Sequence, residues 1–161
     1  MVTVRVATVA DLKAVIEIGT TTWWATYPPI AGDDYVVRGI ATWWTPESMR
    51  PGLEAGRVRI AEHGGSPVGM SSYSTSGPVI DLWKLYVLPE AQGTGAGSAL
   101  LASVVAAAEP EHTTIRLAHK DGNTKARAFY ERKGFVETGR SADEIGGPDN
   151  VWMELALPVR V

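Results

Sequence analysis

A short glycine-rich segment, residues 92–98, carries the clearest chemical signal in this chain. Gly93, Gly95 and Gly97 leave its backbone without Cβ atoms, so a bulky ligand can approach the main-chain N–H groups. The segment follows a strand-like run and precedes an apolar, helix-like run. The first N–H groups of a helix have no partner inside the helix, and the helix dipole adds to their attraction for an anion. We therefore interpret the segment as a pyrophosphate cradle; a tight strand-to-helix turn without a ligand is the alternative.

The spacing of the glycines separates several kinds of phosphate loop. A Walker loop requires a lysine directly after its last glycine, and none follows here. The dinucleotide fingerprint requires a third glycine where Ser98 or Leu100 stands. Gln92, Gly95 and Gly97 instead follow the order Gln-x-x-Gly-x-Gly. This resembles the acetyl-CoA loop of the GNAT superfamily of N-acetyltransferases.

A second segment, residues 123–135, is similar to the same family. It follows the family's pattern Asn-x-x-Ala-x-x-Phe-Tyr-x-x-x-Gly-Phe, with Asn123, Ala126, Phe129, Tyr130, Gly134 and Phe135 in the defined places. With Leu85-Tyr86-Val87-x-Pro89 ahead of the glycines, the resemblance covers roughly residues 79–136. Two separate motifs in the family's order are far more specific than one, so the chain is identified as a member.

The resemblance implies acetyl-CoA as the cofactor and a set of residues that contact it. These are Leu85, Tyr86, Val87, Gln92, Gly93, Thr94, Gly95, Ala96, Gly97, Ser98, Asn123, Ala126, Phe129 and Tyr130. In the family, the tyrosine that matches Tyr130 points its hydroxyl at the sulfur of coenzyme A; a core aromatic is the alternative. Asn123 is interpreted as a helix N-cap, as a polar contact to the pantetheine arm or substrate, or as both.

Acetyl transfer to an amine requires a base, because an alkylamine with a pKa near 10 is almost fully protonated at neutral pH. Releasing that proton costs roughly 4–5 kcal/mol at pH 7. Asp81 is the candidate base, since several family members carry a catalytic glutamate at the matching position. Strict alternation along the strand places Asp81 on one face with apolar neighbours. Those neighbours are Val79, Trp83, Leu85 and Val87. A solvated aspartate at a strand's start is the alternative.

The developing oxyanion needs a preset donor, and the leaving thiolate needs an acid. The resemblance implies the Val87 N–H as the donor and Tyr130 as the acid. Pro89 has no N–H to donate, so strand pairing should break near it and leave a gap for the pantetheine amides.

The acceptor site is harder to predict from the sequence. In the family it is shaped by the first helices and the last hairpin, where aromatic and acidic side chains are dense. The candidate acceptor-binding residues are Trp23, Tyr27, Asp33, Asp34 and Trp83. Many of the aromatic residues are expected in the core, and helix capping is an alternative for the acidic pair. His119, at a strand end, should face the cofactor side.

Periodicity predicts a mixed α/β protein with about seven strands and four helices, in the order β-α-α-β-β-β-α-β-α-β-β. The expected strands are residues 2–7, 57–62, 68–74, 79–88, 114–118, 135–140 and 151–157. The first expected helix begins at residue 8 and ends at Tyr27-Pro28-Pro29. Further helices are expected over residues 33–44, 99–108 and 123–133, with a turn or two near 46–55. Residues 1–161 are expected to form a single GNAT domain.

Composition narrows the function classes further. A net charge of −3 argues against nucleic acid as a partner. The absence of cysteine excludes disulfides and thiolate chemistry. Because the histidines are not clustered either, we expect no metal site. No membrane partner is expected, and a cytoplasmic location and a possible homodimer follow by default and by family.

The leading hypothesis is an acyltransferase that acetylates a primary amine of a small molecule, resembling a polyamine, an aminoglycoside or an amino acid. Transfer would be direct, in a ternary complex. A peptide or protein N-terminal amine is a second acceptor class. A GNAT-fold module that binds acetyl-CoA without turnover is the alternative from another class.

Overall fold

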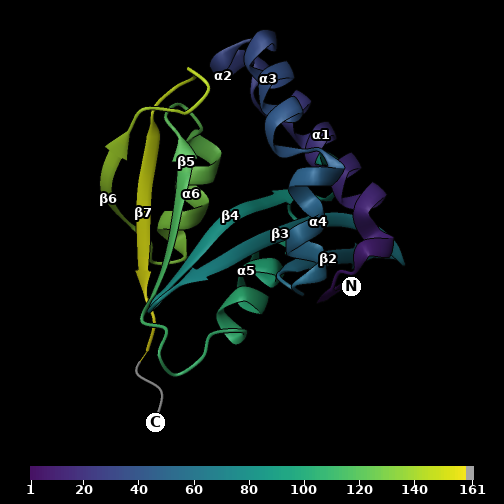
Figure 1. The fold of residues 1–161 in the computed structure, drawn as a ribbon, viewed down its shortest axis with the longest axis vertical. Coiled ribbons are helices and arrows are strands. Elements are labelled where there is room, and N and C mark those ends of the chain that lie inside the picture. Colours follow the sequence, from purple (N-terminus) through teal and green to yellow (C-terminus); the bar gives the residue numbers. More distant parts are fainter. Residues whose placement is uncertain (159–161) are drawn as a thin grey trace.

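The computed structural model describes residues 1–158 as one mixed sheet with helices on both faces (Figure 1). Its strands are β1 Val2–Val6, β2 Val58–His63, β3 Ser66–Ser76, β4 Val79–Val87, β5 Thr114–Lys120, β6 Val136–Ser141 and β7 Asn150–Ala156. The sheet order is β1-β2-β3-β4-β5-β7-β6, and among these neighbours only β4 and β5 run parallel. The predicted mixed α/β fold is confirmed.

Four α-helices, rather than the two expected, connect β1 to β2. They are α1 Leu12–Thr26, α2 Pro28–Ala31, α3 Asp33–Trp43 and α4 Pro46–Glu54; α5 Ala96–Ala106 and α6 Thr124–Arg132 follow later. Proline ends one helix but is well suited to the first turn of the next. Pro28 and Pro46 both occupy such starting positions. Thr45 also caps α4, since its hydroxyl accepts a hydrogen bond from the Ser48 N–H at 3.1 Å.

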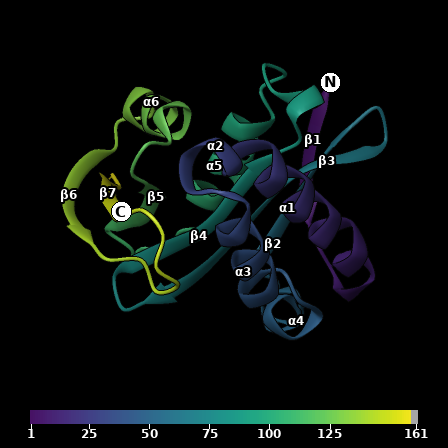
Figure 2. The same ribbon diagram turned by 90° about the horizontal axis from the view of Figure 1, so that it is seen from above.

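The helices divide between the two faces of the sheet, as the view from above shows (Figure 2). Helices α1–α4 pack on one face of β2–β4, around a core that includes Tyr35, Trp44 and Ile60. Helix α5 packs on the opposite face. Helix α6 lies on the same side as α5, because side chains of both helices share a second core with β4, β5 and β7.

Strands β4 and β5 stay paired over only three rungs, Val79–Thr114, Ile80–Ile115 and Asp81–Arg116. Beyond the last rung they diverge, and Figure 1 shows β5 turning away from β4. A β-bulge in β4 at Trp83 interrupts its register with β3 just past this point. Because a bulge bends and twists its strand, the gap opens at the bulge, well before Pro89, where the sequence placed it.

The same bulge reverses the side-chain alternation that the sequence predicted for β4. Leu82 and Leu85 both pack in the core on the α5 and α6 side, although strict alternation would separate them. Tyr86 packs in the opposite core with α1–α4. Asp81, which alternates with Leu82, therefore shares the face of Tyr86, and its predicted grouping with Leu85 and Val87, which pack on the α5 side, is wrong. The Trp83 indole donates to the hydroxyl of Ser74, the β3 partner of Asp81, at 2.7 Å, so Trp83 stays on the face of Asp81.

Candidate active site

A cleft of about 600 Å³ occupies the gap between the diverging strands. Its walls come from β4, the loop before α5, the end of β5, α6 and the second half of α1. The volume lies within the range of small-molecule and cofactor sites. All the predicted cofactor residues except Thr94 line it. The Thr94 hydroxyl instead donates to the Ala91 carbonyl and closes the loop.

The glycine loop directs main-chain N–H groups at one end of this cleft. Gly93 and Gly95 have φ angles of 86° and 89°, where a side chain would strain the backbone. Gly95 is also the N-cap of α5, and the Ala99 N–H makes the helix's first backbone bond, to the Gly95 carbonyl at 3.0 Å. The N–H groups of residues 96–98 precede that bond, so they have no acceptor within the helix. This end of the cleft fits a diphosphate.

Two contacts hold the loop against the rest of the cleft. The Lys125 ammonium on α6 donates to Gln92 Oε1 at 3.1 Å, which joins the loop to α6. A Cβ atom added to Gly97 would lie 3.4 Å from the Phe129 ring. Any larger side chain at Gly97 would therefore project into the space between α5 and α6.

The backbone of Val87 faces the gap. The Leu88 N–H donates to the Val68 carbonyl on β3 at 2.8 Å. Since alternate residues of an antiparallel strand point their backbone groups to opposite sides, the N–H and C=O of Val87 point away from β3. Gln92 Nε2 donates to that carbonyl at 3.4 Å from the cleft side. This orientation is the one that an oxyanion donor or a pantetheine contact requires.

Tyr130 brings a phenol to the same cleft. Its ring is held edge-on by Phe129 and Phe135, with ring centres 5.3 and 5.5 Å away. Burial and the neighbouring Tyr86 hydroxyl raise the pKa of Tyr130 above its usual value of 10. It is therefore protonated at neutral pH and able to donate a proton. Among residues 1–158, no group hydrogen-bonds its hydroxyl, which leaves that hydroxyl available to a ligand.

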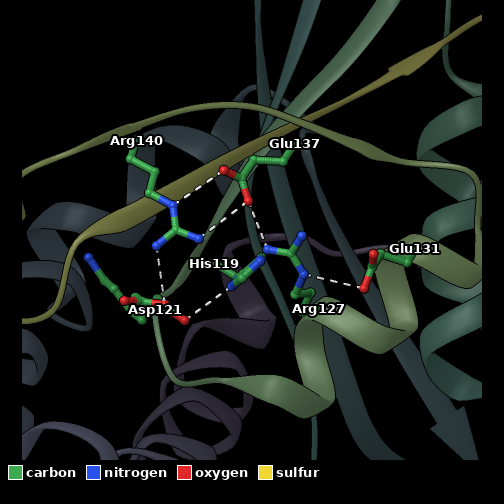
Figure 3. A network of polar contacts seen from close by, with 7 residues as sticks. His119, Asp121, Arg127, Glu131, Glu137 and Arg140 are labelled. Atoms are coloured by element: carbon green, nitrogen blue, oxygen red, sulfur yellow. Dashed lines mark hydrogen bonds and ion pairs between the residues drawn. The ribbon is translucent and has the colours of Figure 1, made fainter.

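An ion-pair network anchors α6, which carries Tyr130, to β6 (Figure 3). Arg127 on α6 donates to Glu137 on β6 at 2.8 Å, and Arg140 reaches the same carboxylate at 3.3 Å. These contacts lie at the surface, where a single ion pair contributes at most about 1 kcal/mol. Their role is mainly to fix where α6 sits.

Asp81 does not line the cleft; it is bound by Arg116. One Asp81 oxygen lies 2.8 Å from Arg116 Nε and 2.7 Å from a terminal guanidinium nitrogen. The Asp81 side chain is 6% exposed, and its partner is 40% exposed. The two residues form the last paired rung of β4 and β5. The ion pair therefore sits at the vertex of the gap, and the Asp81 carboxylate has a cationic partner that the sequence did not predict.

The predicted acceptor residues divide into two groups. Tyr27 and Trp83 line the cleft. Trp23 does not: it is buried in the core and stacks on Tyr35 at 5.7 Å, because Gly39 leaves room for its ring. Asp33 and Asp34 are exposed on the first turn of α3, outside the cleft lining.

Several residues that line the cleft were not predicted from the sequence. They are Thr22, Thr26, Leu82, Ala91, Leu117, Ala118, Lys125, Ala128 and Arg132. Helical spacing carries a signal for two groups, since Thr22 and Thr26 lie one turn apart on α1, and Lys125, Ala128 and Arg132 share a face of α6. His119, for which only an orientation toward the cofactor side was expected, lines the cleft as well.

A split pair of parallel strands, with a helix N-terminus at its open end and a buried, protonated tyrosine inside, forms a cleft whose geometry suits acyl transfer. The chain belongs to the acetyltransferase (GNAT) family, whose sequence model matches residues 20–135. This membership confirms an acyltransferase enzyme that uses acetyl-CoA.

Individual relatives agree with this assignment. The probable N-acetyltransferase Rv2775 of Mycobacterium tuberculosis is 31% identical over 148 residues, which are 86% of this chain and 82% of that protein. The 5-NmdU N-acetyltransferase of Pseudomonas phage PaMx11 is 32% identical over 102 residues, 62% and 69% of the two chains. The PaiA N-acetyltransferase of Thermoplasma acidophilum, solved with coenzyme A, superposes with a TM-score of 0.86 at 20% identity, covering 97% and 99%. Among residues 1–158, no helix is long and apolar enough to cross a membrane.

Proposed function

We propose that this protein is a single-domain N-acetyltransferase that moves the acetyl group of acetyl-CoA to the primary amine of a small molecule. The acceptor class is polyamine-, aminoglycoside- or amino-acid-like, and transfer is direct, in a ternary complex. The diphosphate is assigned to the backbone of residues 93–98 and the pantetheine arm to Val87 and Asn123. Tyr130 donates the proton that the leaving thiolate takes up. Bound acetyl-CoA supplies the activated acyl group.

The observation that favours a small acceptor is the docked loop between β6 and β7. In this loop the Asp143 carboxylate, 1% exposed, pairs with Lys120 of β5. The Ile145 carbonyl accepts a hydrogen bond from Arg38 of α3 at 3.3 Å. Gly147 packs so closely on the Tyr35 ring that an added Cβ would lie 2.1 Å from a ring carbon. Figure 1 shows the loop beside α2 and α3.

A loop held by a buried ion pair and close packing covers the acceptor side of the molecule. Burial alone would raise the pKa of Asp143, but its hydrogen bonds with Lys120 and the Gly147 N–H outweigh burial and lower it. The loop is thus fixed at neutral pH, and a long polypeptide would have to displace it. A small amine would not.

A peptide N-terminus is the second candidate, because a further hollow of about 440 Å³ lies on the outer face of β5, β7 and β6. Arg116, Arg140, Trp152 and Glu154 line it, a mixture of charges and an aromatic ring suited to a residue beyond the reacting amine.

For Asp81 we propose a positioning role. Its ion pair with Arg116 fixes the rung from which β4 and β5 diverge, and its carboxylate is already occupied by two guanidinium contacts.

The test has two stages. Calorimetry with coenzyme A should show saturable binding, and no heat with well-folded protein would refute the cofactor site. Thiol release from acetyl-CoA should then exceed the hydrolytic background with at least one of polyamines, aminoglycosides and amino acids. Faster release with peptide N-termini would favour the second candidate, and binding without release by any amine would favour a non-catalytic sensor.

A further inference from the structure

His119 is a buried histidine, and only one of its two ring nitrogens makes a hydrogen bond. The residue is 7% exposed, and its Nδ1 lies 3.1 Å from the Lys120 carbonyl oxygen. A carbonyl only accepts hydrogen bonds, so Nδ1 carries the ring proton and Nε2 holds a free lone pair. Nε2 is completely buried, and within residues 1–158 it has no hydrogen-bond partner. A buried acceptor left unpaired costs about 1–3 kcal/mol.

The other buried histidine of the described chain has the opposite arrangement. His112 is 9% exposed, and its Nδ1 accepts a hydrogen bond from the Glu109 N–H at 2.9 Å. His112 does not line the cleft, whereas His119 does. The histidine with the unpaired nitrogen is therefore the one that lines the cleft.

His119 lies on the face of β5 that packs against Tyr130, the proposed acid. Ile115, Leu117 and His119 alternate along β5 and so share one face. Ile115 and Leu117 pack in the core cluster that contains Tyr130. At about 3.3 Å per residue, His119 lies roughly 7 Å beyond Leu117 along this face, toward the open end of the cleft. In Figure 3 its ring lies between the turn that carries Asp121 and the Arg127 side chain.

The charged groups around His119 already have partners. Lys120 is paired with Asp143, Asp121 with Arg140, and Arg127 with Glu131 and Glu137. Its strand neighbour on β7 is the apolar Val151. None of these groups competes for Nε2, so the nitrogen is left for a donor that enters the cleft.

We propose that His119 Nε2 is the general base of the acetyl transfer, an inference that rests on the function proposed above. Nε2 takes one proton from the acceptor ammonium, which leaves a neutral amine. The amine nitrogen forms a bond to the thioester carbonyl carbon, and the carbon–sulfur bond breaks. The sulfur takes a proton from Tyr130, which regains one from the reacting nitrogen. His119 then releases its proton to water, so each turnover yields an N-acetyl product, coenzyme A and one proton.

The test compares His119→Gln and His119→Ala with the wild type. Loss of a positioned base typically costs 10²–10⁴-fold, so kcat should fall by at least about 10²-fold in both variants. The rise of kcat/KM with pH that reports the base should disappear. Added imidazole should restore part of the His119→Ala rate, which a merely structural histidine would not allow. His112→Gln is the matched control and should keep the wild-type kcat.

Several results would overturn the assignment. The first is an unchanged kcat with a weaker Kd for coenzyme A, which would make His119 a pantetheine contact. The second is loss of activity without imidazole rescue in variants whose Tm matches the wild type. The third is independent of turnover: a long-range ¹H–¹⁵N spectrum at alkaline pH showing the proton on Nε2 rather than Nδ1. If the wild type binds coenzyme A but releases none with any amine, the proposed function fails and the base assignment falls with it. Normal wild-type turnover with active His119 variants refutes the base alone.

Discussion

Replacing Lys84 by methionine should stabilise the protein at neutral pH. Lys84 lies on β4 with its Nζ 5.0 Å from the centre of the Trp44 ring, and no carboxylate of residues 1–158 pairs with it. Burial lowers its pKa from 10.5 to about 8. At about 1.4 kcal/mol per pKa unit, this is an upper limit of about 3 kcal/mol for holding the charge there. The Trp44 ring returns about 1 kcal/mol of cation–π energy, so Lys84→Met should raise the free energy of unfolding by about 2 kcal/mol.

The stability difference between Lys84→Met and the wild type should change with pH in a defined direction. Below about pH 8 the lysine is charged in the folded and the unfolded chain, so the full penalty applies. Between pH 8 and 10.5 the folded chain has lost the proton that the unfolded chain still holds, so wild-type stability rises with pH. Methionine binds no proton. The advantage of Lys84→Met should therefore be largest below pH 8 and shrink toward pH 10.5.

Urea unfolding of both proteins, followed by tryptophan fluorescence at pH 7, 8, 9 and 10, measures this difference. Lys13→Met is the control, because Lys13 is exposed on α1; its effect should stay within about 0.5 kcal/mol at every pH. A Lys84→Met protein less stable than the wild type at pH 7 would show that the contact with Trp44 outweighs desolvation. A difference independent of pH would refute the lowered pKa.

Three further substitutions test the site. Tyr130→Phe should lower kcat by about 10²-fold and change the free energy of unfolding by less than about 1 kcal/mol, since its ring packing is kept; unchanged kcat would return Tyr130 to a core role. Gly95→Val should abolish coenzyme A binding in calorimetry, because φ at this position is 89° and a side chain would stand before the free N–H groups; wild-type affinity would contradict the cradle. Asp81→Asn should cost about 1–3 kcal/mol in urea unfolding and keep the pH dependence of kcat/KM. Loss of that dependence at unchanged stability would identify Asp81 as the base.

The sequence by itself determined the parts of the site that lie close together in the chain. Gln92, Gly95 and Gly97 define the loop because backbone conformation and helix start depend on neighbouring residues. Asn123 caps α6, its side chain accepting from the Ala126 N–H at 3.2 Å, for the same reason. Tyr130 was assigned by the resemblance of residues 123–135 to the family's motif, which is also a pattern of near neighbours. The strands and helices built on such short-range patterns were placed close to their observed bounds.

Tertiary structure decided what depends on how distant segments meet. The bulge at Trp83 arises from pairing between β3 and β4, and it moves Leu85 and Val87 to the face opposite Asp81. Alternation within β4 alone does not reveal that shift. Asp81 itself is bound by Arg116, which lies on another strand. Likewise, His119 lies on the part of β5 that no longer pairs with β4, and its Nε2 has no partner among residues 1–158. The local motifs identify the loop that would bind the diphosphate of acetyl-CoA. The divergence of β4 and β5 decides which side chains lie near the thioester.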